Sequence, residues 1–360
     1  MGAFTPMNLK DGNSEVQLLH TKLEASKLPA DLKEKALHQI ERIELTLQYG
    51  GNFSQLDITD KYIDWITNLP WETMSQDTLD VTKAKAVLDA NHHALEKIKA
   101  RVLEYLSVLI MQKKFQGQHA PFHAPILFFV GLAGTGKTTF AKSIAEALGR
   151  KFIRIPFGGL SSALDLRGQS KTTPQAEPGQ VIRNLRLAGT RNPVILLDEL
   201  DRVTPEARSA VMGVLIELLD PGQNKSYTDY FIDYPFDLSQ ALFVATANNT
   251  RDISTAVLDR LEVIQMPSYT DAEKITIAKE YVLPKALKNA GLPADAVTVD
   301  DATWSKLTRP LGFDAGIRTL ERTIDGVIRK AALKIVSGQG MKFVVNDQNV
   351  REFVEGGVMG

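Results

Sequence analysis

A glycine-rich segment that ends in lysine and threonine carries the clearest chemistry in this sequence. Residues 131–138 read Gly-Leu-Ala-Gly-Thr-Gly-Lys-Thr and fit the pattern G-x-x-x-x-G-K-[ST]. Glycines let the backbone wrap around phosphate groups, so that its N–H groups and a following helix N-terminus face the anion. Lys137 should reach the β- and γ-phosphates, and the Thr138 hydroxyl should ligate Mg²⁺. The residues expected to hold the nucleotide are Gly131, Leu132, Ala133, Gly134, Thr135, Gly136, Lys137, Thr138 and Thr139.

A second candidate pair is acidic. Asp198 and Glu199 follow the apolar run 194–197, which predicts a buried strand. Such a strand delivers both acids to its carboxyl end, where ligands bind in open α/β sheets. Asp198 is placed to bind Mg²⁺ directly or through water, and Glu199 to polarise an attacking water. Downstream of the phosphate-binding loop, the pair predicts hydrolysis of the bound nucleotide.

Three further polar residues keep more than one interpretation. Asn248 follows another apolar run, and its amide is suited to orient the water. Arg260 is suited either to neutralise the γ-phosphate of a neighbouring subunit or to form a surface ion pair with Asp259 or Glu262. Arg318, early in a predicted helix, is unremarkable by itself.

The elements that must position these residues alternate between strand and helix patterns up to about residue 267. Short apolar runs predict buried strands at 124–130, 152–155, 193–197 and 241–246. The alternation, which includes a helix at 139–148, predicts an α/β fold with a parallel sheet. Helical patterns occupy 15–47, 58–71, 78–90 and 95–115 before the sheet and 270–338 after it, with breaks near 291–293 and 310–312.

Composition excludes several classes of protein. The chain has 360 residues, a formal net charge of −1 and no cysteine, which excludes disulfides, thiolate metal sites and cysteine nucleophiles. Near-neutral charge gives no electrostatic reason to expect nucleic acid or an anionic membrane as the main partner. The N-terminus lacks a signal pattern, and the longest apolar stretch, 124–133, falls short of the about 20 residues that a membrane span needs. We therefore expect a soluble, cytoplasmic protein of two or three domains.

Together these motifs resemble the AAA+ ATPases and, within them, the Lon family of ATP-dependent proteases over about residues 15–355. The segments that carry the narrower resemblance are 62–71, 95–99, 149–152, 166–168, 178–179, 218–224, 234–239, 258–264 and 315–318. The resemblance implies a P-loop sheet with helices on both faces and a small helical lid. The corresponding boundaries are an N-terminal helical region at 1–118, a large α/β domain at 119–267, the lid at 268–340 and a linker at 341–360.

The resemblance also implies roles for the ambiguous residues. Asn248 takes the sensor-one position, Arg260 the arginine finger and Arg318 the sensor-two arginine, and His93 lies near the adenine. ATP and Mg²⁺ are the implied cofactors. The family forms a homohexameric ring with ATP between subunits, and its pore loops pull unfolded protein toward a peptidase chamber. The implied partners are copies of the same chain, protein substrates and a peptidase domain or subunit.

The sequence departs from the Lon pattern at several places. A peptidase domain with a Ser-Lys dyad should follow about residue 355, so we expect no peptide cleavage by these residues. Thr173 and Pro174 replace an aromatic-aliphatic pair in the first pore loop, and Ala207 leaves the second without a large apolar residue. His92-His93-Ala94 replaces a His-Tyr-Gly segment near the adenine. Two alternatives to a threading motor follow: an ATP-driven switch or scaffold, and, with less support, a motor acting on nucleic acid.

Overall fold

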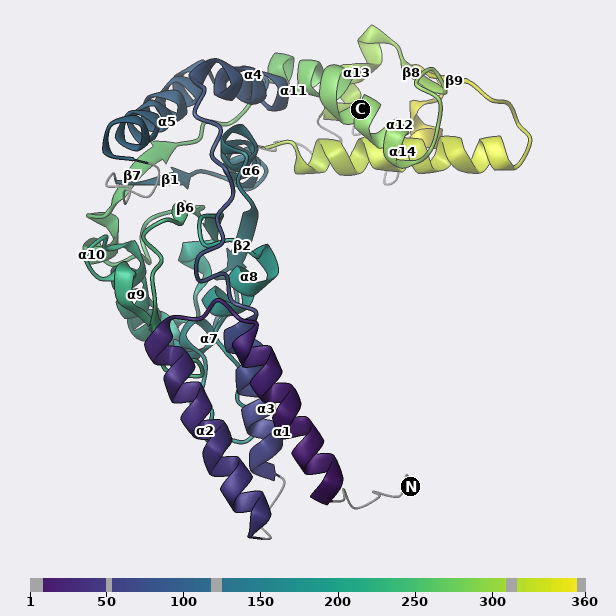
Figure 1. Cartoon of the computed structure of the whole chain (residues 1–360). Helices are drawn as coiled ribbons and strands as arrows, with labels where there is room; N and C mark the ends of the chain where they lie inside the picture. The colour runs from purple at the N-terminus through teal and green to yellow at the C-terminus, as the bar shows by residue number, and fades with distance from the viewer. Residues whose placement is uncertain (1–8, 50–53, 118–124, 309–315, 355–360) are drawn as a thin grey trace.

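A parallel sheet lies at the centre of the computed structural model, which describes residues 9–49, 54–117, 125–308 and 316–354 (Figure 1). Within these residues five strands pair in the order β2-β3-β6-β1-β7, all parallel. They are β1 (Ile126–Val130), β2 (Phe152–Pro156), β3 (Val194–Asp198), β6 (Leu242–Ala247) and β7 (Leu261–Gln265). The sequence predicted the first four of these. It missed β7 because this edge strand alternates buried residues with the exposed Val263 and Gln265.

Helices cover both faces of the sheet, as the resemblance implied. One face packs against α4 (Val81–Asn91), α5 (Glu96–Gln116) and α6 (Lys137–Leu148). The other face packs against α7 (Leu164–Arg167), α8 (Gln180–Ala188), α9 (Pro205–Leu219), α10 (Thr255–Leu258) and the hairpin of β4 (Tyr227–Asp229) and β5 (Tyr234–Phe236). Single 3₁₀ turns lie at Leu200–Arg202 and Asn224–Ser226. The boundary expected at residue 118 does not separate two cores, because α4 and α5 share one core with β1 and α6.

Three N-terminal helices extend away from the sheet as adjacent rods (Figure 1). They are α1 (Leu9–Glu24), α2 (Ala30–Gln48) and α3 (Ser54–Thr67). Pro29 stands immediately before α2, where its missing N–H costs no helical hydrogen bond. At the base of the rods Tyr62 donates a hydrogen bond to the Ile232 carbonyl (3.3 Å) and packs against Phe231. The N-terminal helices thereby share a core with the face of the sheet that α7, α8, α9 and α10 cover.

A separate helical lid with its own core follows the sheet (Figure 1). It contains α11 (Asp271–Ile277), a π-helical turn (Ala278–Val282), α12 (Leu283–Asn289), a 3₁₀ turn (Asp301–Thr303), α13 (Trp304–Thr308), α14 (Arg318–Val336) and α15 (Val350–Phe353). Two short parallel strands, β8 (Val297–Val299) and β9 (Phe343–Val345), were not predicted from the sequence.

The lid extends further along the chain than expected. Val345 and Phe353 are buried in the lid core, so the linker predicted at 341–360 is wrong for the residues up to 354. Hydrophobic burial of β9 and α15 is the physical reason. The remaining linker residues, 355–360, and the predicted break at 310–312 lie outside the described residues. Among the helices that the structure describes, none has the length and apolar character needed to cross a membrane.

Candidate nucleotide-binding site

The phosphate-binding loop joins strand β1 to the N-terminus of α6. Gly134 and Gly136 have φ angles of +79° and +94°, a backbone conformation that glycine adopts without strain. Lys137 is the first residue of α6, and its Nζ donates to the carbonyl oxygens of Gly131 (2.5 Å) and Leu132 (2.9 Å). Burial lowers the pKa of Lys137, and the nearby Arg318 acts in the same direction. The ammonium group is thus held inside the loop, where an anion would be favoured.

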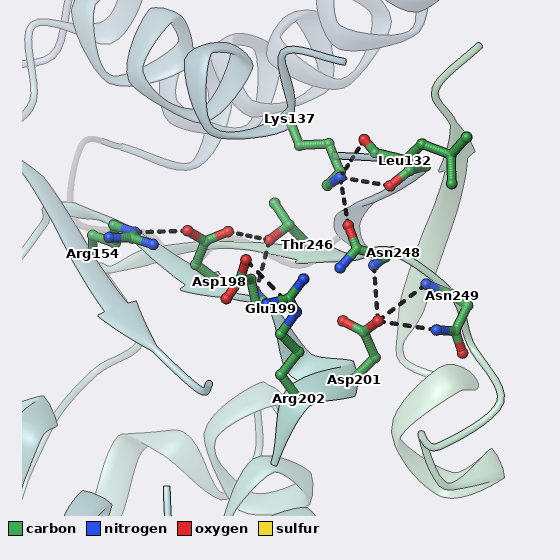
Figure 2. Close-up of polar contacts among 11 residues, drawn as sticks. Leu132, Lys137, Arg154, Asp198, Glu199, Asp201, Arg202, Thr246, Asn248 and Asn249 are labelled. Carbon is green, nitrogen blue, oxygen red and sulfur yellow. Dashed lines mark hydrogen bonds and ion pairs between the residues drawn. The ribbon is translucent and has the colours of Figure 1, made fainter. Parts of the chain in front are cut away.

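Asp198 is buried at the carboxyl end of β3 and is held from two sides (Figure 2). The Thr246 hydroxyl on β6 donates to its Oδ1, and Arg154 on β2 donates from Nε to its Oδ2 at 2.6 Å. The order β2-β3-β6 places both partners on the strands beside Asp198. Sequence reasoning singled out neither Thr246 nor Arg154, because only the pairing of distant strands brings them here.

Glu199 leaves the strand in a left-handed conformation, with φ of +62°. Its backbone N–H donates to the Thr246 hydroxyl at 3.0 Å, so Thr246 contacts both acidic residues. The Glu199 carboxylate lies beside Gly158, where an added Cβ would stand 3.0 Å from Oε2. Arg202 is 3.9 Å away, and 28% of the Glu199 side chain is exposed. Glu199 therefore remains accessible to a water molecule, as a general base must be.

Asn248 lies between the lysine of the loop and a third acidic residue (Figure 2). Its Oδ1 accepts from Lys137 Nζ at 3.2 Å, and its backbone N–H donates to Asp201 at 3.1 Å. Asp201 also accepts from the backbone and side chain of Asn249. Asp201 is another residue that the sequence analysis missed. Its proximity to the acidic pair in sequence was the available signal.

The lid closes one side of the cavity that the phosphate-binding loop and the acidic pair line. The Ile317 N–H donates to the Gly134 carbonyl at 3.1 Å, which brings the start of α14 onto the phosphate-binding loop. A Cβ on Gly316 would stand 2.4 Å from the Ala133 carbonyl oxygen. One cavity is lined by Ala133, Gly134, Gly136, Lys137, Thr138, Thr139, Asp198, Glu199, Asn248 and Arg318. The structure thus brings together most of the residues that the sequence predicted for the site.

The two adjacent histidines have different surroundings. His92 is buried, stacks on Phe140 with ring centroids 3.7 Å apart and contacts the Ser143 hydroxyl at 3.0 Å. Burial lowers the pKa of His92 to about 4. His93 instead lines a neighbouring cavity of about 690 Å³, together with Gly136, Tyr269 and Tyr281 among others. His93 and Gly136 of the phosphate-binding loop therefore line one cavity.

Arg260 lies away from the cavity that the phosphate-binding loop, Asp198 and Glu199 line. It precedes β7, whereas the phosphate-binding loop follows β1, and the two strands are paired in parallel from Ile126–Leu261 to Val130–Gln265. A strand of five residues separates the two positions by roughly 16 Å. Arg260 Nη2 pairs with Asp220 at 3.1 Å, rather than with the Asp259 or Glu262 considered from sequence. It cannot contact a nucleotide held by its own chain.

The donor set suits a nucleotide with a hard cation. Backbone N–H groups at the start of α6 and the Lys137 ammonium fit phosphate oxygens. The Thr138 hydroxyl and the Asp198 carboxylate are oxygen ligands of the kind that Mg²⁺ takes in phosphate sites. Across the described residues, no group of three or more His, Asp or Glu side chains forms a metal cluster of its own. The cation expected here would therefore be shared with the phosphates.

A parallel sheet with this loop after β1, an acidic pair at the end of β3 and a helical lid on the loop defines an AAA+ ATPase. Residues 127–269 match the family described as ATPase family associated with various cellular activities (AAA). Residues 288–344 match the Lon protease AAA+ ATPase lid domain.

Lon proteases from several bacteria are similar in sequence to nearly the whole of this chain. The chain is 39% identical over 345 residues to Lon protease of Heliobacterium modesticaldum, covering 96% of this chain and 41% of that protein. It is 40% identical over 350 residues to Lon protease 2 of Thermus thermophilus and 39% identical over 346 residues to Lon protease 1 of Bacillus subtilis. In both comparisons 96% of this chain and 43% of the relative are covered. The chain is a Lon-like AAA+ ATPase module and spans less than half the length of these relatives.

Proposed function

We propose that this module binds ATP with Mg²⁺ in the cavity between the sheet and the lid and hydrolyses it at interfaces between identical subunits. The observation that carries the proposal is the convergence of Lys137, Asp198, Glu199 and Arg318 on one cavity. These residues come from three separate parts of the chain, and their types match the parts of a phosphoryl-transfer site.

Each residue has a distinct role in this proposal. Lys137 and Arg318 bind phosphate oxygens, and the backbone of 131–139 orients them. Thr138 and Asp198 hold Mg²⁺, which would neutralise charge on the phosphates. Glu199 accepts a proton from the attacking water, which Asn248 orients. His93 lies on the side of the base.

Arg260 requires a second subunit in this proposal. Because roughly 16 Å of strand separates it from its own phosphate-binding loop, it can act only on the nucleotide of a neighbour. Such an arrangement is met in a closed ring, and the resemblance to Lon favours a homohexamer. Protein substrates and the peptidase part of a Lon protease are the corresponding partners, and the cytoplasm is the corresponding location.

The test is Glu199→Gln, which keeps the size of the side chain and removes the base. We expect ATP affinity to be preserved and hydrolysis to fall by about 10²- to 10⁴-fold. ATP turnover at the wild-type rate would contradict the mechanism. Binding of a fluorescent ADP analogue to the same variant serves as the control for folding of the site.

A second candidate, an ATP-driven switch that does not thread polypeptide, is favoured by the loop 168–179. Gly168 and Gly179 approach closely at its base, and Lys171 lies 4.0 Å from the centre of the Tyr62 ring on α3. Lys61 on the same helix donates to the Ala176 carbonyl at 2.8 Å and to Glu177 at 2.5 Å. The exposed tip, 172–175, is Thr-Thr-Pro-Gln and offers no aromatic side chain.

The region expected to form a second pore loop supports this candidate as well. Pro205 begins α9, and Ala207 is buried in the core rather than exposed at a loop tip. Thr173→Tyr would therefore add the grip that the wild type lacks, and we expect it to increase unfolding of a tagged substrate protein. Robust unfolding by the wild type would exclude the switch and leave the threading motor.

A further inference from the structure

The contact between Arg154 and Asp198 is the feature of the site that the proposed function leaves unexplained (Figure 2). Arg154 Nε lies 2.6 Å from Asp198 Oδ2. The carboxylate is 5% exposed, whereas the arginine side chain is 50% exposed. The acid is therefore fixed and buried, while its cationic partner borders the solvent.

The two oxygens of Asp198 differ in their partners. Oδ1 accepts from the Thr246 hydroxyl, which is neutral and wholly buried on β6. Oδ2 accepts from the guanidinium of Arg154. A divalent cation that approaches this carboxylate meets the positive charge of Arg154, and like charges at such distances repel strongly at a partly buried site. Metal binding must therefore displace Arg154 or be opposed by it.

We propose that Arg154 is a positioning residue that holds Asp198 in its orientation and excludes free divalent cations from it. The cation then enters only together with nucleotide phosphates, whose negative charge outweighs the guanidinium. This inference rests on the proposed function, because it assigns the cation site to Asp198. The half-exposed Arg154 side chain can move toward solvent when the cation enters. The Thr246 hydroxyl then still orients the Asp198 carboxylate.

A purely structural ion pair makes a different prediction. Loss of Arg154 would then lower the stability of the fold and leave the affinity for a bare cation unchanged. If Arg154 excludes cations, its neutral replacement instead creates a site for the cation alone, because a buried carboxylate without a countercharge attracts one. The two cases are separated by measuring metal binding without nucleotide.

The experiment measures Mn²⁺ binding to the whole chain by electron paramagnetic resonance in the absence of nucleotide. We expect Arg154→Gln to bind Mn²⁺ about tenfold or more tightly than the wild type, which corresponds to about 1.4 kcal/mol. Arg154→Lys retains the charge and should bind as weakly as the wild type. Adding Asp198→Asn to Arg154→Gln should abolish the gain, which would locate the site.

Equal Mn²⁺ affinity in the wild type and Arg154→Gln would overturn the inference, as would an equal gain in Arg154→Lys. The affinity for a fluorescent ADP analogue is measured with Mg²⁺ and with EDTA. We expect Mg²⁺ to improve ADP binding less in Arg154→Gln than in the wild type. Failure of the wild type to bind ADP would instead contradict the proposed function, so the two failures are distinguishable. Thermal melting of each variant confirms that it is folded.

Discussion

Arg260→Ala tests whether ATP hydrolysis needs a second subunit. Arg260 stands at the opposite end of β7 from the phosphate-binding loop, roughly 16 Å away. That separation exceeds the Debye length of about 8–10 Å at physiological salt, so its charge has little effect on its own site. If Arg260 acts on a neighbouring nucleotide, its loss should slow hydrolysis by about 10³- to 10⁵-fold, the usual contribution of an arginine finger.

The decisive assay mixes two inactive variants. Arg260→Ala keeps an intact cavity but offers no arginine, whereas Glu199→Gln offers the arginine but lacks the base. In randomly mixed rings at equal concentration, one interface in four joins an intact cavity to an intact arginine. ATP turnover should therefore recover to about one quarter of the wild-type rate per subunit, because active sites at subunit interfaces are assembled from both chains.

No recovery after subunit exchange, with mixed assembly confirmed by native mass spectrometry, would refute the reasoning. So would wild-type turnover by Arg260→Ala alone. Folding is not expected to interfere, because the Arg260–Asp220 pair is partly exposed and such pairs contribute about 0–1 kcal/mol. Thermal melting of both variants provides that control.

Two further predictions concern the lid and a buried histidine. Gly316→Ala should weaken ADP binding by about tenfold or more, because the added Cβ would stand 2.4 Å from the Ala133 carbonyl oxygen and push the lid away from the loop. Gly213→Ala is the control, because an added Cβ there meets nothing within 4 Å. Equal ADP affinities of the two variants would contradict the lid contact. His92 has a pKa lowered from 6.5 to about 4, so the unfolded chain binds more protons between these values and stability falls as the pH drops from 6.5 toward 4, by up to about 3 kcal/mol. Chemical denaturation at several pH values should show a flatter profile for His92→Gln than for the wild type, and identical profiles would contradict the assignment.

Sequence patterns predicted the parts of the fold whose signal is local. The strands β1, β3 and β6 are continuous apolar runs because both of their faces are covered. The edge strand β7 and the short strands β8 and β9 escaped because one face of each meets solvent and dilutes the apolar pattern. The position of β9 and α15 in the lid core depends on contacts with distant helices, which no local pattern records.

The sequence by itself determined the phosphate-binding loop and the acidic pair, because consecutive residues in a strand, loop and helix fix that geometry. Gly134, Gly136 and Lys137 needed only their own neighbours along the chain to be recognised. The tertiary structure decided which side chains surround Asp198, because the strand order β2-β3-β6 brings Arg154 and Thr246 to it from 44 and 48 residues away. It also placed Arg260 at the far end of the sheet, since the direction of β7 relative to β1 is set by strand pairing and not by sequence proximity.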